Sequence, residues 1–137
     1  MKKIAVIDGQ GGGIGSLIVK RLREEFGDGI EIIALGTNST ATNAMMKSRA
    51  NKGATGENAI VWNADRVDII IGTLSIALPN GMMGELTPAM ATAIIASSAK
   101  KLLLPLNQEA VEIVGFLKEP LPHLIEKLVA QITVLSG

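Results

Sequence analysis

The chain has 137 residues, a length typical of one compact domain with a sizeable core. Its 13 Lys and Arg residues balance its 13 Asp and Glu residues, and this zero net charge argues against nucleic acid as a partner. The absence of cysteine excludes disulfides and thiolate metal sites. Because the chain has only one histidine, a zinc site or a His-based catalytic triad is also disfavoured.

Hydrophobic residues make up 47% of the chain, which is more apolar surface than one small core hides, so we expect a homo-oligomer.

The first apolar run stops at Asp8 after four residues, too short for the apolar region of a signal peptide. Turn residues interrupt the apolar stretch at 69–95 before it reaches the length of a membrane span. We therefore expect a cytoplasmic protein with no membrane partner.

Apolar runs of strand length alternate along the chain with segments of helical periodicity. We expect strands at residues 3–7, 30–35, 67–71, 101–104 and 111–116. We expect helices at residues 13–26, 39–49, 57–64, 88–97 and 120–135, and a loop at 53–58. This alternation predicts an α/β fold, a Rossmann-like doubly wound and mainly parallel five-stranded sheet with helices on both faces, formed as a single domain over residues 1–137.

Five glycines occupy seven consecutive positions between the first expected strand and the first expected helix. Glycines gather where the backbone takes positive φ or where another group approaches closely, and the start of a helix offers unpaired N–H groups to an anion. We expect a nucleotide or another phosphorylated ligand here. The alternative is a tight strand-to-helix turn that binds nothing. The expected binding residues of this loop are Gly9, Gln10, Gly11, Gly12, Gly13, Ile14 and Gly15.

The spacing of these glycines excludes several well-known nucleotide loops. The strict G-x-G-x-x-G pattern fails, and a P-loop lysine is missing because Gly15 is followed by Ser16. The pattern Gly9-x-x-x-Gly13-Ile14-Gly15 resembles the cofactor loop of short-chain dehydrogenases. That family's catalytic Tyr-x-x-x-Lys cannot exist here because the chain has no tyrosine. The resemblance thus supports binding and not hydride transfer.

Polar side chains follow the expected strands, and the carboxyl ends of parallel strands meet at one edge of a sheet, where ligands bind. The second strand is followed by Thr37 and Asn38, without the acidic residue that usually holds a ribose. Either residue can hydrogen-bond a ribose weakly, so NAD(P), a mononucleotide and other phosphorylated metabolites all stay open. The other polar residues expected at this edge are Asp8, Gln10, Thr73, Ser75, Asn107 and Gln108.

Asp8 and Glu85 are the candidate catalytic residues. For Asp8 the favoured interpretation is a carboxylate that accepts the loop's own amides, and for Glu85 a solvated residue ahead of a helix. The alternative is a small enzyme that acts on a phosphorylated metabolite, with a magnesium ion shared by the two carboxylates. We expect no other metal site.

Residues 73–85 form an apolar connection, longer than usual and broken by turn residues. Such a segment is a candidate lid or contact surface. It suggests a third hypothesis, in which the protein is an oligomeric structural or partner-binding module without a ligand.

Five sequence blocks, IDGQGGGIG at 7–15, ALGTN at 34–38, GATGENA at 53–59, GELTPAM at 84–90 and LPLN at 104–107, carry a family resemblance. Together they resemble an uncharacterised bacterial family of the Firmicutes type, the domain of unknown function DUF3842. The resemblance implies a Rossmann-like fold, and it adds neither a reaction nor a catalytic residue. Our leading hypothesis is a protein that binds a phosphorylated ligand at the glycine loop in a sensor or accessory role.

Overall fold

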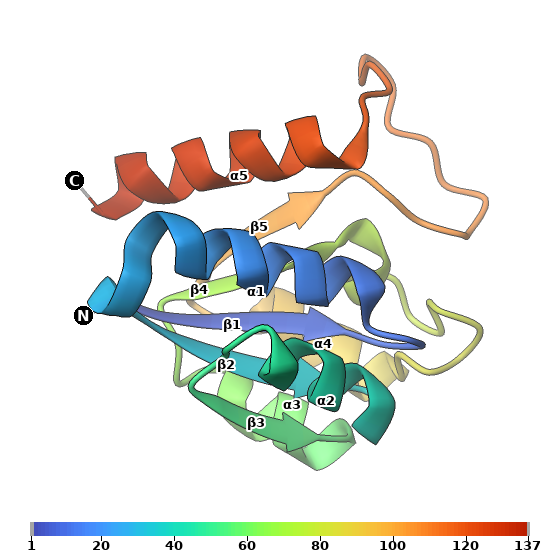
Figure 1. The fold of residues 1–137 in the computed structure, drawn as a ribbon. Helices are drawn as coiled ribbons and strands as arrows, with labels where there is room; N and C mark the ends of the chain where they lie inside the picture. Colours follow the sequence, from blue (N-terminus) through green and yellow to red (C-terminus); the bar gives the residue numbers. More distant parts are fainter. Residues whose placement is uncertain (1, 137) are drawn as a thin grey trace.

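The computed structural model describes residues 2–136 and contains a five-stranded sheet whose neighbouring strands are all parallel. The strand order is β3-β2-β1-β4-β5 (Figure 1), so the order reverses between β1 and β4. The strands are β1 Lys2–Asp8, β2 Ile30–Gly36, β3 Lys52–Thr55, β4 Ile69–Thr73 and β5 Lys100–Leu104.

Helices cover both faces of the sheet. Figure 1 shows α1, α2 and α5 on one face and α3 and α4 on the other. This arrangement confirms the expected α/β, Rossmann-like fold. The helices are α1 Gly13–Phe26, α2 Ser39–Lys47, α3 Glu57–Ala64, α4 Pro88–Ala96 and α5 Leu121–Ser136, with short 3₁₀ turns η1 Gly27–Gly29 and η2 Leu74–Ala77.

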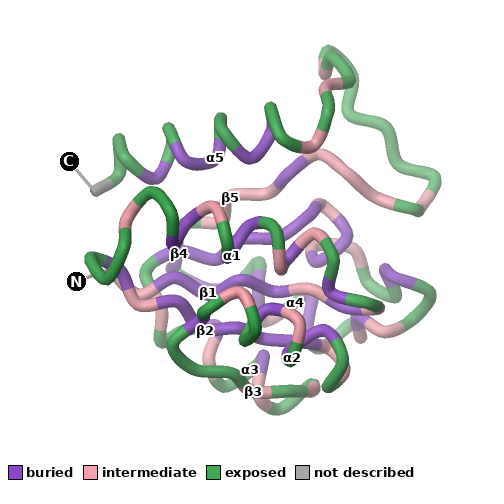
Figure 2. Tube along the Cα trace, in the orientation of Figure 1, coloured by how far each residue is buried: buried purple, intermediate pink, exposed green. Residues whose placement is uncertain are grey.

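Two apolar cores lie on the two faces of the sheet because successive strand residues point in opposite directions. In β1, Ile4 and Val6 pack with the cluster that contains α1 and α5 residues. Ala5 and Ile7 pack with the cluster that contains α3 and α4 residues. All four are buried, and the central strands are buried along most of their length (Figure 2). A strand enclosed on both faces explains the continuous apolar runs of the sequence.

The identity of the fifth strand was predicted wrongly. Residues 111–116 form no strand, and their side chains are mostly exposed, with Val114 98% exposed. The fifth strand is instead β3, within a segment expected to be a loop. β3 lies at the sheet edge and is held by backbone pairing to β2, so its mostly exposed residues carry no apolar pattern.

Local capping sets two of the helix starts. The Thr87 side chain accepts a hydrogen bond from the Met90 amide at the start of α4, and Pro88 occupies the first helical position. The Asn38 side chain accepts a hydrogen bond from the Ala41 amide at the start of α2.

Within residues 2–136, no helix is both long enough and apolar enough to cross a membrane.

Candidate functional site

The glycine loop joins β1 to α1 at the carboxyl edge of the sheet. Three of its glycines are required by close packing within the chain. A Cβ at Gly9 would lie 2.6 Å from the Thr37 hydroxyl, and one at Gly15 would lie 2.7 Å from the Met45 sulfur. Gly12 has a φ of 72°, and a Cβ there would lie 2.7 Å from the Cα of Ala41. A Cβ at Gly11 or Gly13 would meet open space. Only those two glycines leave room for a ligand. Ala41 and Met45 belong to α2.

Asp8 ends β1 and accepts hydrogen bonds from two amides of the loop that follows it. Its Oδ1 accepts from the Gly9 amide at 2.8 Å and its Oδ2 from the Gly15 amide at 2.7 Å. Burial raises the pKa of the Asp8 carboxyl above its usual value, while these two hydrogen bonds favour the charged form. Asp8 therefore holds the loop closed in the way that its favoured interpretation predicted.

Glu85 lies far from Asp8 in sequence but reaches the same loop. Its Oε1 accepts from the Gln10 amide at 2.8 Å, the Thr37 hydroxyl at 2.7 Å and the Asn38 side-chain amide at 2.8 Å. The hydrogen bond from the Gln10 amide, helped by those from the two side chains, lowers the pKa of Glu85. The prediction of a solvated side chain ahead of a helix missed these contacts, because no local pattern joins residues 75 positions apart.

Thr37 and Asn38 follow β2 and stand beside the loop, as expected from parallel strand ends. β1 and β2 pair from Lys2 with Ile30 to Asp8 with Gly36, which places Thr37 next to the loop. Both side chains donate to Glu85, and Asn38 also donates to the Gln10 carbonyl. Their donors are thus engaged by the chain itself.

A cavity of about 230 Å³ opens at the point where the strand order reverses, beside the ends of β1, β4 and β5. In sheets of this kind ligands bind at that reversal. Neither Thr37, Asn38 nor Glu85 lines the cavity. The residues that line it include Asp8, Ile14, Thr73, Ser75, Met82 and Asn107.

Three amide side chains contribute to the polar lining of this cavity. Gln10 and Gln108 also line it, and the Gln108 side-chain amide donates to the Gln10 side-chain oxygen at 3.0 Å. The Asn107 side-chain amide donates to the Val111 carbonyl, whereas its Oδ1 is buried without a hydrogen-bond partner. A buried acceptor without a donor is unfavourable, so Oδ1 is a natural point for a ligand N–H or O–H group.

The segment at 73–85 packs over this edge and is held by a residue that sequence reasoning missed. Glu109 accepts from the Met82 amide at 2.8 Å, the Gln108 amide at 2.9 Å and the Ser75 hydroxyl at 3.2 Å. Met82 is buried, although Met83 is 89% exposed. The sequence carries no sign of these contacts, because Glu109 lies in a stretch without regular structure.

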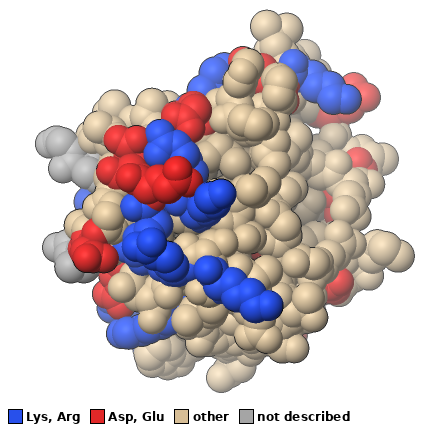
Figure 3. Space-filling model, viewed as in Figure 1, with Lys and Arg blue, Asp and Glu red and all other residues tan. Residues whose placement is uncertain are grey.

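Charged side chains are unevenly distributed over the surface. In Figure 3, Lys and Arg side chains lie among Asp and Glu side chains on the side away from the strand ends. A hollow of about 310 Å³ is lined by Lys20, Lys47 and Arg49 but also by Glu24. Within the described residues no three His, Asp or Glu side chains gather where they could hold a metal ion. Any anion at the loop would therefore depend on backbone amides.

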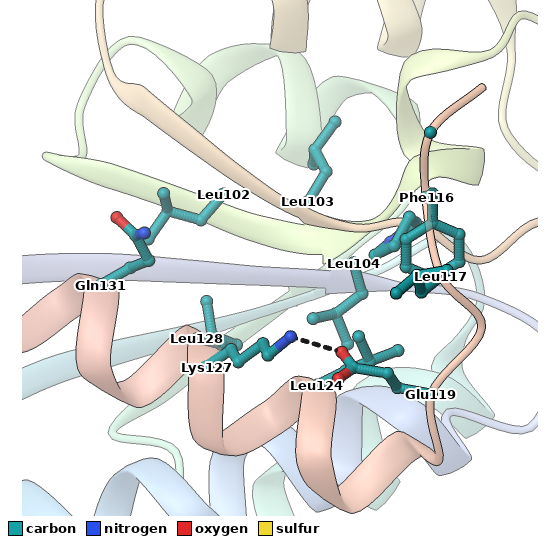
Figure 4. Close-up of a pocket in the computed structure, with 12 residues that line it drawn as sticks. Leu102, Leu103, Leu104, Phe116, Leu117, Glu119, Leu124, Lys127, Leu128 and Gln131 are labelled. Atoms are coloured by element: carbon teal, nitrogen blue, oxygen red, sulfur yellow. Dashed lines mark hydrogen bonds and ion pairs between the residues drawn. The ribbon is translucent and has the colours of Figure 1, made fainter. Parts of the chain in front are cut away.

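A larger and more apolar cavity, of about 470 Å³, lies between β5 and α5. Figure 4 shows Leu102 and Leu104 of β5 on the side of Leu124 and Leu128 of α5, with Phe116 and Leu117 of the connecting segment at one end. Lys127 and Glu119 form an ion pair of 2.7 Å beside it. No pattern in the sequence predicted this cavity.

The chain matches the model of one protein family, described as a domain of unknown function (DUF3842), over residues 3–136. No curated protein matches the chain.

Proposed function

The chain belongs to the DUF3842 family, whose description assigns no activity, and from the geometry of the strand ends we propose that it binds a small phosphorylated ligand in the cavity beside β1 and β4. The single observation that carries the proposal is that Asn107, whose buried Oδ1 has no hydrogen-bond partner, is among the residues that line that cavity. A sensor or accessory role fits a site that binds without an evident reacting group.

The phosphate group would lie on the glycine loop. Within residues 2–136 the amides of Gly11, Gly13 and Ile14 make no hydrogen bond, and Gly13 and Ile14 open α1. The first turn of α1 carries no acidic residue of its own, and the Asp8 carboxylate takes up only its Gly15 amide. Helix starts of this kind bind phosphate with backbone N–H groups alone.

The size of the cavity favours a mononucleotide or a smaller metabolite over NAD(P). Small-molecule pockets usually measure about 300–1,000 Å³, and this cavity is smaller. The space over Gly9, along which a dinucleotide would extend towards β2, is filled by Thr37, Met82 and Glu85. NAD(P) would have to displace the segment at 73–85.

Exchanging one glycine for aspartate tests the proposal. Gly13→Asp places a negative charge at the phosphate position, where the added side chain has open space, so binding of AMP, ADP and inorganic phosphate should fall at least about tenfold. The matched control is Gly29→Asp, which has equally open space in η1, away from the loop. Isothermal titration calorimetry measures both.

Asn107→Ala adds a second arm to this experiment. Removal of Oδ1 should weaken nucleotide binding without changing the affinity for inorganic phosphate, because only the nucleotide has donors to reach Asn107. The proposal would be contradicted if AMP, ADP and inorganic phosphate bound with equal affinity to the natural chain, Gly13→Asp and Gly29→Asp. It would also be contradicted if the natural chain bound none of them measurably.

The enzymatic alternative for Asp8 and Glu85 has weaker support. Both carboxylates lie at the same edge, but each already accepts amides of the glycine loop. Glu85 does not line the cavity. A catalytic role for either residue stays a prediction from the sequence.

A cytoplasmic location of the protein also stays a prediction from the sequence.

We also propose that the protein self-associates through apolar surface near β5. Val114 and Leu117 are 98% and 81% exposed in the segment between β5 and α5, and Leu117 borders the larger cavity of Figure 4. Apolar residues gathered in this way are typical of interfaces. β5 is also an edge strand, with β4 as its only strand partner in the sheet.

A further inference from the structure

Three donors of the strand-end loops converge on one oxygen atom. The Gln10 amide, the Thr37 hydroxyl and the Asn38 side-chain amide all lie 2.7–2.8 Å from Oε1 of Glu85. Gln10 follows β1, Thr37 and Asn38 follow β2, and Glu85 comes from the separate segment after β4. The donors form a receptor for an anionic oxygen, and the chain's own carboxylate occupies it.

Glu85 fills the space directly above the glycine loop. A Cβ at Gly9 would lie 3.0 Å from its Oε1 and 2.9 Å from the Met82 sulfur. The other carboxylate oxygen of Glu85, Oε2, accepts no hydrogen bond within residues 2–136. The group is charged near neutral pH because its hydrogen bonds lower its pKa. A negatively charged group therefore already stands where a ligand's second anionic group would extend.

The turn that carries Glu85 contains unfavourable backbone conformations, although several backbone hydrogen bonds hold it. Met82 and Met83 have φ of 57° and 58°, in the left-handed region that non-glycine residues rarely adopt. The Leu86 amide donates to the Gly81 carbonyl, and Glu109 holds the Met82 amide. Opening of this turn would relieve the left-handed backbone conformation at Met82 and Met83.

We propose that the Gln10 amide, the Thr37 hydroxyl and the Asn38 side-chain amide form a second anion subsite, which Glu85 occupies until the second phosphoryl group of a diphosphate ligand replaces it. The inference rests on the proposed function, because the first phosphoryl group lies on the amides of Gly11, Gly13 and Ile14. Gln10 and Gly11 are adjacent in the chain, so one diphosphate spans both groups of donors. The ligand class narrows to diphosphate esters such as a nucleoside diphosphate.

Inorganic pyrophosphate and inorganic phosphate are the probes that test this inference. In Glu85→Gln the competing negative charge is gone, and the ratio of pyrophosphate affinity to phosphate affinity should rise at least about tenfold over the natural chain. The matched control is Glu112→Gln, which removes the same charge from an exposed residue and should leave the ratio within about twofold. Titration calorimetry gives both affinities.

An unchanged or lower ratio in Glu85→Gln overturns the inference. If Gly13→Asp still abolishes phosphate binding in that case, the proposed function stands without it. If neither probe binds to the natural chain or to Glu85→Gln, both proposals fail. A gain of pyrophosphate binding in Glu85→Gln alone supports the second subsite even where the natural chain binds phosphate weakly.

Amide hydrogen exchange of the natural chain gives an independent measurement should Glu85→Gln fail to fold. Pyrophosphate should accelerate exchange of the Leu86 amide, because release of Glu85 opens the turn in which that amide donates to the Gly81 carbonyl. Phosphate at the same concentration should change it less. Equal or slower exchange of the Leu86 amide with pyrophosphate overturns the inference.

Discussion

Two carboxylates at one edge of the sheet have pKa values displaced in opposite directions. Burial raises the pKa of Asp8, although two loop amides partly compensate. Hydrogen bonds lower the pKa of Glu85, which is only partly buried. The difference arises because Asp8 lies at the end of a buried central strand, whereas Glu85 lies on a surface turn and receives three donors.

The lowered pKa of Glu85 predicts a dependence of stability on pH. A carboxylate with a depressed pKa in the folded state stabilises the fold above its unfolded pKa, near 4.5, and loses this contribution as the pH falls through the folded value. The melting temperature of the natural chain should therefore exceed that of Glu85→Gln most at neutral pH. The difference should shrink between about pH 5 and pH 3.

Differential scanning calorimetry of the two chains across this range checks the prediction. Asp8 is present in both chains, so the part of its opposite contribution that comes from burial is common to both. The Glu85 charge is the smallest of the causes that raise the Asp8 pKa, and only this part is lost in the variant. A difference in melting temperature that stays constant with pH would show that Glu85 contributes through packing alone.

The strand, loop and helix at the start of the chain act as one element. The 13–26 helix was predicted at its observed bounds, and so was the role of Asp8 in accepting the loop amides. The roles of the individual glycines could not be predicted, because Gly12 is opposed by Ala41 of α2 rather than by its own chain neighbours. Glycine content marks a constrained turn but does not say what constrains it.

Substitution of neighbouring glycines separates packing from ligand binding. Gly12→Ala should lower the free energy of unfolding by about 1–3 kcal/mol, because φ is 72° there and the new Cβ would lie 2.7 Å from the Ala41 Cα. Gly11→Ala, with open space at the same loop, should change it by less than about 0.5 kcal/mol. Urea denaturation compares the two, and equal losses would contradict the assignment of Gly12 to packing.

The apolar surface beside β5 is a property of the whole molecule. The segment at 105–120 crosses from the end of β5 to α5 without forming a helix or strand, and it exposes Val114 and Leu117. In Figure 2 most of this segment is exposed. The high apolar content of the sequence is thus only partly hidden by the two cores.

If the protein self-associates through the surface that contains Val114 and Leu117, its mass in solution depends on these two residues. Static light scattering of the natural chain should give a multiple of 14.3 kDa, and the double variant Val114→Glu and Leu117→Glu should approach 14.3 kDa. Val61→Glu, a partly exposed control on α3, should leave the mass unchanged. If Met83→Glu lowers the mass instead, the contact surface is the segment at 73–85, and a natural chain of 14.3 kDa would contradict self-association.

Most of the fold could be predicted because its elements carry their own periodicity. The α3 helix was predicted at its observed bounds, and four of the strands within a few residues. The error concerns β3 and residues 111–116. An edge strand needs only backbone pairing, so β3 lacks an apolar pattern, whereas the apolar residues of 111–116 belong to no strand and are mostly exposed.

The sequence by itself determined the family, the α/β fold, the constrained glycine loop and the edge of the sheet to which the polar residues come. Only the tertiary structure decided what those polar residues do there. Glu85 and Glu109 reach the site from distant segments, and Asn107, which lines the cavity, has a buried oxygen without a hydrogen-bond partner. The physical reason is that helices and strands are encoded by neighbours a few residues apart, whereas a site is made by side chains that meet only after the chain has folded.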